Sequence, residues 1–208
     1  MLIFKALSAL LSYPTAEMRE ALPEIAEVVR GSRFVAERER AGLLALIGEL
    51  DHDDLLAVEE RYVDLFDRGR ALSLNLFEHL HGDSRDRGKA MIDLKQLYAK
   101  VGFELSSREL PDFIPVLLEY LSQRPIEEAR ELLADCSAIL ASICRSLIAR
   151  QSGYASALQA LLVIAGEQPI DAAKIPPVRS QRENIDQEWA EQPAFAADAT
   201  PRAGGQVN

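Results

Sequence analysis

The residues best suited to chemistry in this chain lie together in the stretch from Glu78 to Asp83. Two carboxylates and two imidazoles stand within it, carried by Glu78, His79, His81 and Asp83. Such groups are zinc ligands, and they also act as general acids and bases in hydrolysis. One hypothesis is therefore a metal-binding or hydrolytic protein that uses these four side chains.

The spacing of the two histidines limits that hypothesis. Residues two apart on an α-helix point about 200° away from each other, so His79 and His81 cannot chelate one metal ion from a regular helix. A zinc site would require Gly82 to loosen the turn. Two further interpretations stay open and can both hold: the histidines hydrogen-bond nearby carboxylates and fix the loop, or they line a peptide-binding groove.

Arg85 and Arg87 come next, at the start of a predicted helix, where the helix dipole disfavours positive charge. Carboxylates should compensate for these charges, and the candidates are Glu78, Asp83, Asp112 and Glu119. The pattern favours a fixed arginine–carboxylate network made by Asp83, Arg85 and Arg87 with such partners. It leaves open a bound anion, such as the phosphate of a pterin cofactor.

Three other acids are candidates for a binding site. Glu119 is the single charged residue in the apolar run from Ile114 to Leu121, and a buried carboxylate is costly unless it is paired. We therefore expect Glu119 either to pair with an arginine or to face a cleft that receives a cationic ligand. Asp64 and Asp67 flank Phe66, and they are either ordinary surface acids or the acidic rim of that cleft.

Bulk properties exclude several classes of function. The net charge of −10 argues against binding nucleic acid, whose phosphates require a basic surface, and favours cationic partners. The sequence contains no Gly-x-Ser-x-Gly motif, no glycine-rich phosphate loop and no CxxC motif. No apolar run reaches the roughly 20 residues that a membrane span needs, and Met1–Leu7 is predicted to be a first helix rather than a signal peptide.

Helical periodicity runs through most of the chain, which predicts an all-α, single-domain multi-helix bundle over residues 1–168. Five of the ten prolines follow in residues 169–208, which we predict to be a flexible Pro-rich tail. Four local predictions can be checked directly: an N-cap at Thr15, an N-cap at Asp53, an N-cap at Asp112, and one long helix over 125–151. The last would carry Cys136 and Cys144 about 12 Å apart, too far for a disulfide, which suits a cytoplasmic protein.

Three segments carry a resemblance to a known family. They are YVxLFD (Tyr62–Asp67), LSLxLFEHLHGDSRxRG (Leu72–Gly88) and ELPDFxPxLLEYL (Glu109–Leu121). In this order they resemble the assembly chaperones of respiratory nitrate reductase, the NarJ family, within the wider TorD-like group of all-helical maturation chaperones. The resemblance covers about Phe4 to Glu167. Many members of the wider group have histidine where this chain has Phe113, so no histidine role is carried over to that position.

The resemblance implies a function. The chain would bind the basic N-terminal segment of the apo catalytic α subunit of membrane-bound nitrate reductase. It would assist insertion of the molybdenum cofactor before the client docks at the membrane, without joining the final enzyme. It would be no enzyme, hold no permanent cofactor and act in the cytoplasm as a monomer or weak homodimer. Cofactor-delivery proteins are further candidate partners, and a generic helical adaptor is a lesser alternative.

The expected mode of binding is a helix lying in a groove with an apolar floor and an acidic rim. The residues predicted to form this groove are Tyr62, Asp64, Phe66, Asp67, Leu76, Phe77, Glu78, His79, His81, Asp112 and Glu119.

Overall fold

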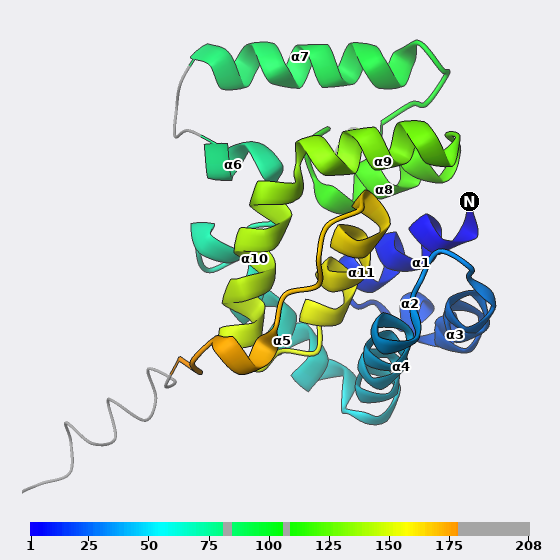
Figure 1. Cartoon of the computed structure of the whole chain (residues 1–208), viewed down its shortest axis with the longest axis vertical. Helices are drawn as coiled ribbons and strands as arrows, with labels where there is room; N and C mark the ends of the chain where they lie inside the picture. Colours follow the sequence, from blue (N-terminus) through cyan, green and yellow to red (C-terminus); the bar gives the residue numbers. More distant parts are fainter. Residues whose placement is uncertain (81–84, 106–108, 179–208) are drawn as a thin grey trace, which may run out of the picture. The chain divides into compact units, whose positions relative to one another are not determined.

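The computed structural model describes residues 1–80, 85–105 and 109–178, with side chains described from residue 87 onward in the second of these ranges. Within these ranges the protein is all-α, without a β-strand, as the periodicity predicts (Figure 1). The elements in chain order are α1 (Leu2–Leu11), α2 (Ala16–Glu20), α3 (Leu22–Gly31), α4 (Glu37–His52), α5 (Leu55–Phe66), the 3-10 turn η1 (Arg70–Leu72), α6 (Leu76–Leu80), α7 (Arg85–Ala99), α8 (Ile114–Ser122), α9 (Ile126–Asp135), α10 (Ser137–Ala149), α11 (Ala155–Ala165) and the 3-10 turn η2 (Ala172–Lys174). The first compact unit of the chain comprises Met1–Pro177.

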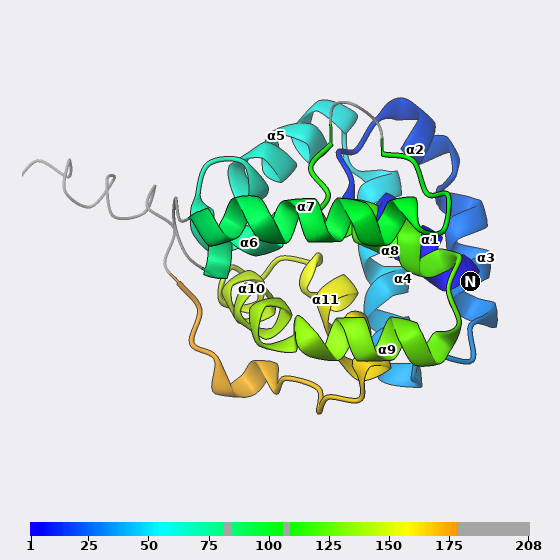
Figure 2. The same cartoon turned by 90° about the horizontal axis from the view of Figure 1, so that it is seen from above.

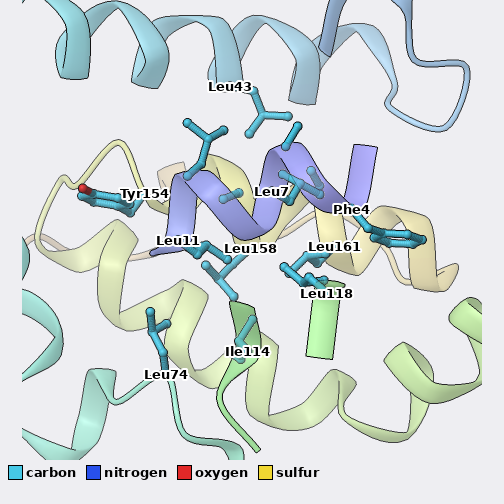
Figure 3. Packing of buried hydrophobic residues seen from close by; sticks show 14 of the residues in the cluster. Phe4, Leu7, Leu11, Leu43, Leu74, Ile114, Leu118, Tyr154, Leu158 and Leu161 are labelled. Atoms are coloured by element: carbon cyan, nitrogen blue, oxygen red, sulfur yellow. The ribbon is translucent and has the colours of Figure 1, made fainter. Parts of the chain in front are cut away.

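The core is built around α1, which packs most extensively against α8 and also contacts α3 and α11. Phe4, Leu7 and Leu11 of α1 are fully buried. Figure 3 shows them close to Leu118 of α8 and Leu158 of α11, both of which are also fully buried. Because α1 is apolar on nearly every side, it can be covered by neighbours on several faces at once.

Some predicted boundaries are confirmed by the local hydrogen bonding. The Thr15 side chain accepts a bond from the Met18 N–H and caps α2. Pro23 lies in the first turn of α3, where a backbone N–H would have no partner within the helix and is not needed. The last long helix, α11, ends at Gly166, whose φ of 96° is the left-handed conformation that terminates helices.

The prediction of one long helix over 125–151 is wrong. The helix is interrupted at Cys136, which separates α9 from α10, and the two are bent by 70° relative to each other. Leu133 and Leu140, on either side of the break, are both buried, and both helices pack against α11. A straight helix of this length could not place the apolar faces of both halves against α11. Burial of these faces therefore favours the bend. Within the described ranges, no single helix has the length and apolar composition to cross a bilayer. Helices α9 and α10 reach that length and composition only when they are counted together.

Two of the predicted N-caps are also wrong. Helix α5 is capped by Asp54, whose carboxylate accepts a bond from the Ala57 N–H, while Asp53 pairs with Arg61 instead. Asp112 does not cap α8, which begins at Ile114 without a side-chain cap. The carboxylate of Asp112 reaches a different helix, which forms part of the candidate site below.

The segment predicted as a tail begins with an ordered contact. The side-chain amide of Gln159 in α11 donates to the carbonyl of Ile170 at 2.7 Å and accepts from its N–H at 2.9 Å. The turn η2 follows, with Asp171 accepting a bond from the Ala173 N–H. Residues 179–208 lie outside the described residues.

Candidate functional site

The candidate site lies where the second and third motif segments meet, between η1, α6 and the start of α8. Leu72, Leu74 and Leu76 are almost fully buried and fix the chain on both sides of Ser73. The Leu74 carbonyl accepts a bond from the Ile114 N–H at 2.9 Å, forming part of an isolated antiparallel bridge between Asn75 and Phe113. Two segments about 40 residues apart in sequence are thereby held in register.

Asp112 ties this junction together. Its side chain is fully buried, and Oδ2 accepts a bond from the Phe77 N–H at 2.9 Å, which caps the N-terminus of α6. The Asp112 carbonyl accepts from the Leu76 N–H as well, at 3.0 Å. Burial raises the pKa of the Asp112 carboxyl above its usual range; Arg87 opposes this shift and Glu78 reinforces it. Asp112 was predicted to line a groove, and the structure places it beneath α6.

An arginine–carboxylate pair lies beside Asp112. Nη2 of Arg87 is 3.7 Å from Oε1 of Glu78, and both side chains are 27% exposed. At this distance the two side chains form an ion pair but no close hydrogen bond. Asp83 and the side chain of Arg85, which we expected in the same network, lie outside the described residues.

The histidines of the motif are described only in part. Nε2 of His79 lies 2.8 Å from the carbonyl oxygen of Ser73, so this nitrogen is tied to the backbone of the preceding loop. The described residues contain no group of three or more histidine, cysteine or acidic side chains that could hold a metal ion. His81 and Asp83 of the metal hypothesis lie outside those residues.

A cavity of about 490 Å³ opens next to this junction, and we call it the η1 cavity. Its lining residues are Phe66, Asp67, Arg68, Gly69, Arg70, Ser73, Asn75 and Glu78. Its two arginines are engaged within the protein: Arg68 pairs with Asp64 at 2.8 Å, and Arg70 donates to the carbonyl of Glu78 at 2.9 Å. Asp67 is exposed and has no salt-bridge partner among the described residues, so its carboxylate is available to a cation.

The predicted apolar floor is largely inside the protein. Tyr62 is 4% exposed, its hydroxyl donates to the Leu11 carbonyl at 2.9 Å, and its ring packs on Phe66 with 4.8 Å between centroids. Phe66 and Leu76 are also buried, and Phe77 is half-buried. Of these aromatic and aliphatic residues, Phe66 alone is among those that line the η1 cavity.

Glu119 stands apart from this cavity. It is solvent-exposed on α8, and its pKa is raised by partial burial and by Glu109, while Lys5 lowers it. Glu119 has no arginine partner among the described residues and does not line the η1 cavity, so the choice between its two expected roles stays a prediction. The structure therefore gathers Phe66, Asp67 and Glu78 in one place and leaves Glu119 elsewhere.

Sequence reasoning missed four polar residues of the cavity, Arg68, Arg70, Ser73 and Asn75. All four lie between the end of α5 and the start of α6. For Ser73 and Asn75 the available signal was their alternation with the buried leucines on either side of them.

Within its described residues the protein is all-helical, and its η1 cavity is lined by Phe66, two carboxylates, two arginines and small residues. A family model described as nitrate reductase delta subunit matches residues 13–157, and the chain belongs to that family. This confirms the resemblance drawn from the three motif segments.

Individual relatives agree with the family match. The chain is 44% identical over 168 residues to the nitrate reductase molybdenum cofactor assembly chaperone NarJ of Escherichia coli K12, covering 81% of this chain and 71% of that protein. It is 35% identical to the probable chaperone NarW of the same organism, over 97% of this chain and 89% of the relative. A probable NarJ of Bacillus subtilis is 32% identical over 76% of this chain and 85% of its own length.

Proposed function

We propose that this protein is an assembly chaperone for a nitrate reductase and assists insertion of the molybdenum cofactor into it. The observation that carries this proposal is the 44% identity to a chaperone of that name over 81% of the chain. The role is one of binding rather than catalysis, and no cofactor stays bound to the chaperone. The protein acts in the cytoplasm, as a monomer or weak homodimer, and cofactor-delivery proteins are further candidate partners.

The client in this proposal is the catalytic α subunit in its apo form, bound through its basic N-terminal segment. A chaperone favours an immature client only if its affinity differs between the two states of the client. Binding must therefore weaken once the cofactor is in place, which releases the α subunit to dock at the membrane. The chaperone does not remain in the finished enzyme.

We place the contact for this segment at the η1 cavity and the exposed end of α5. Three features support this location: a cavity of about 490 Å³, the exposed carboxylate of Asp67, which has no ion-pair partner among the described residues, and Glu78 at the opposite end of the lining segment. The excess of acids over bases in the whole chain adds a longer-range attraction for a basic segment. His81 remains a candidate contact from the motif.

Calorimetry with a peptide copy of the client's N-terminal segment tests the location. We expect Asp67→Lys to raise the dissociation constant at least fivefold, since an ion pair with a partly desolvated carboxylate contributes about 1 kcal/mol or more. Asp64→Lys should weaken binding less, because Asp64 is already paired with Arg68. Glu24→Lys, an exposed acid of α3, is the matched control for the change in net charge.

Two outcomes would contradict parts of this proposal. Equal affinities for the Asp67→Lys and Glu24→Lys proteins would remove the η1 cavity from the site while leaving the chaperone role intact. A wild-type protein that fails to bind the peptide at low salt would remove recognition of the N-terminal segment. Charge reversal at Glu119 separates the two acidic regions, because a loss there without one at Asp67 would move the contact to α8.

A further inference from the structure

A second pocket lies away from the predicted groove, and we call it the Tyr154 pocket. It has a volume of about 230 Å³ and lies between the end of α4, one face of α5 and the loop that joins α10 to α11. Its lining residues are Leu46, Glu49, Arg61, Leu65, Arg150, Gln151, Ser152, Gly153 and Tyr154. Nothing in the proposed chaperone role uses these residues.

Tyr154 is the most unusual member of the pocket. Its side chain is 2% exposed, and its ring packs edge-on against Phe66 with 5.2 Å between centroids. The hydroxyl is buried and has no hydrogen-bond partner among the described residues. Figure 3 shows this oxygen at the end of the ring away from Leu11 and Leu158. A buried hydroxyl without a partner carries a desolvation cost that a bound ligand could remove.

The charged groups around the hydroxyl show which way it faces. Burial raises the pKa of Tyr154 to about 12, Arg61 lowers it and Glu49 raises it further. Both of these charged residues line the pocket. Tyr154, Arg61 and Glu49 therefore lie together in the wall of this pocket.

The loop between α10 and α11 is held in a conformation that costs free energy. Gln151 has a φ of 55°, in the left-handed region that residues other than glycine rarely adopt, and Ser152 is held by a bond from its N–H to the Leu147 carbonyl. A Cβ atom at Gly153 would lie 2.6 Å from a carboxylate oxygen of Glu49, so the loop passes close to the end of that side chain. This path brings Arg150 and the N-terminus of α11 to the pocket.

The donors that face the pocket suit a negatively charged group. Arg61 gives one hydrogen bond to Asp53 at 2.9 Å, which leaves most of its five N–H donors free. Arg150 is exposed and has no ion-pair partner among the described residues. The start of α11 adds the positive end of a helix dipole. Two planar guanidinium groups and a hydroxyl can all donate hydrogen bonds to the several acceptor oxygens of a phosphate group.

We propose that the Tyr154 pocket binds a phosphate group, either inorganic phosphate or the phosphate of a monoester, through Arg61, Arg150 and the Tyr154 hydroxyl. Glu49 opposes this binding, because its negatively charged carboxylate lies beside Gly153 of the same loop and would repel an anion. The sign of the effect at Glu49 therefore distinguishes an anion site from a cation site. The proposal stands independently of client recognition.

An NMR titration of the whole protein tests the proposal, with sodium phosphate against sodium chloride of equal ionic strength. We expect saturable shifts of the Gly153 amide with phosphate and none with chloride. Arg61→Gln and Arg150→Gln should each weaken binding at least tenfold, whereas Arg145→Gln, an exposed arginine of α10, should leave it unchanged. Glu49→Gln should tighten binding. Glycerol 3-phosphate in place of phosphate separates the two sources: tighter binding of the ester indicates a monoester ligand.

Tyr154→Phe keeps the ring and removes only the hydroxyl, so it gives a second and independent measurement. In phosphate-free buffer this variant should melt at a higher temperature than wild type, because no buried hydroxyl is left unpaired. Phosphate should raise the melting temperature of wild type and have a smaller effect on the variant. Equal shifts of the Gly153 amide by phosphate and chloride would overturn the proposal. Weaker binding in Glu49→Gln would also overturn it, because that is the result expected of a cation site.

Discussion

Two regions of this molecule hold their chain segments together by different means. In the core, α1, α8 and α11 meet through leucines and Phe4, and nearly every buried group is apolar (Figure 3). At the junction of η1, α6 and α8, hydrogen bonds hold the segments together. The Phe77 N–H donates to Asp112, the Ile114 N–H donates to the Leu74 carbonyl, and the His79 ring bonds to the Ser73 carbonyl. The first region depends on contact area, and the second depends on a few specific polar partners.

The difference explains where a binding surface can form. A core made of interlocking leucines has no accessible polar group to offer to a partner. The junction fixes α6, a helix of only five residues, by capping it from another segment, and so it can hold Asp67, Glu78 and small polar residues around an open cavity. Helix α7 lies at one edge in Figure 1, and Figure 2, seen from above, shows it crossing over α6 and α8. The hydroxyl of Tyr98 ties α7 to the Pro111 carbonyl at 2.8 Å, one residue before Asp112.

The largest effect that would distinguish the two regions is expected from matched leucine truncations. Leu118 of α8 is fully buried, and Leu80 at the end of α6 is 50% exposed. Leu118→Ala should lower the free energy of unfolding by about 2–5 kcal/mol, because it removes apolar contact and leaves a cavity. Leu80→Ala should change it by less than about 0.5 kcal/mol. Urea denaturation followed by circular dichroism measures both, and similar losses would contradict the division into two regions.

The second prediction concerns the polar junction and is smaller. Asp112→Ala should lower the free energy of unfolding by about 1–3 kcal/mol, because the buried Phe77 N–H loses its acceptor. Asp112→Asn keeps an oxygen acceptor and removes the buried charge, so at neutral pH it should be more stable than Asp112→Ala. An alanine variant as stable as the asparagine variant would show that the cap contributes nothing to the fold.

The same residue predicts a pH dependence. Burial raises the pKa of Asp112 in the folded protein above its value in the unfolded chain, so the native state binds more protons between the two values. The contribution of Asp112 to the free energy of unfolding therefore falls as pH rises from about 4 through the raised pKa. Wild type should lose stability relative to Asp112→Asn across that window. Parallel pH profiles for the two proteins would contradict a raised pKa at this position.

Much of the apolar region was predictable from the sequence, while the polar junction was not. Periodicity identified the helical class and a first helix at the N-terminus, because the burial of apolar residues depends mainly on their spacing. It could not foresee that Asp112 would cap α6 instead of α8. Both helices begin close to Asp112 in space, and the choice between them follows from the bridge between Asn75 and Phe113. Nor could it place the bend at Cys136, which depends on the path of α11.

The smallest expected effect comes from Arg87, and it separates a charge effect from a packing effect. The pair with Glu78 is partly exposed and 3.7 Å long, so Arg87→Gln should lower the free energy of unfolding at neutral pH by only about 0.5 kcal/mol. Arg68→Gln, which breaks the exposed pair with Asp64, is the matched control and should cost a similar amount or less. The two variants should differ in their pH profiles. Arg87 lowers the pKa of Asp112, so its removal should extend to higher pH the window in which stability falls, and Arg68→Gln should leave that window unchanged. If the window stays fixed in both variants, Asp112 titrates independently of Arg87, and the junction is held by hydrogen bonds without a contribution from this charge.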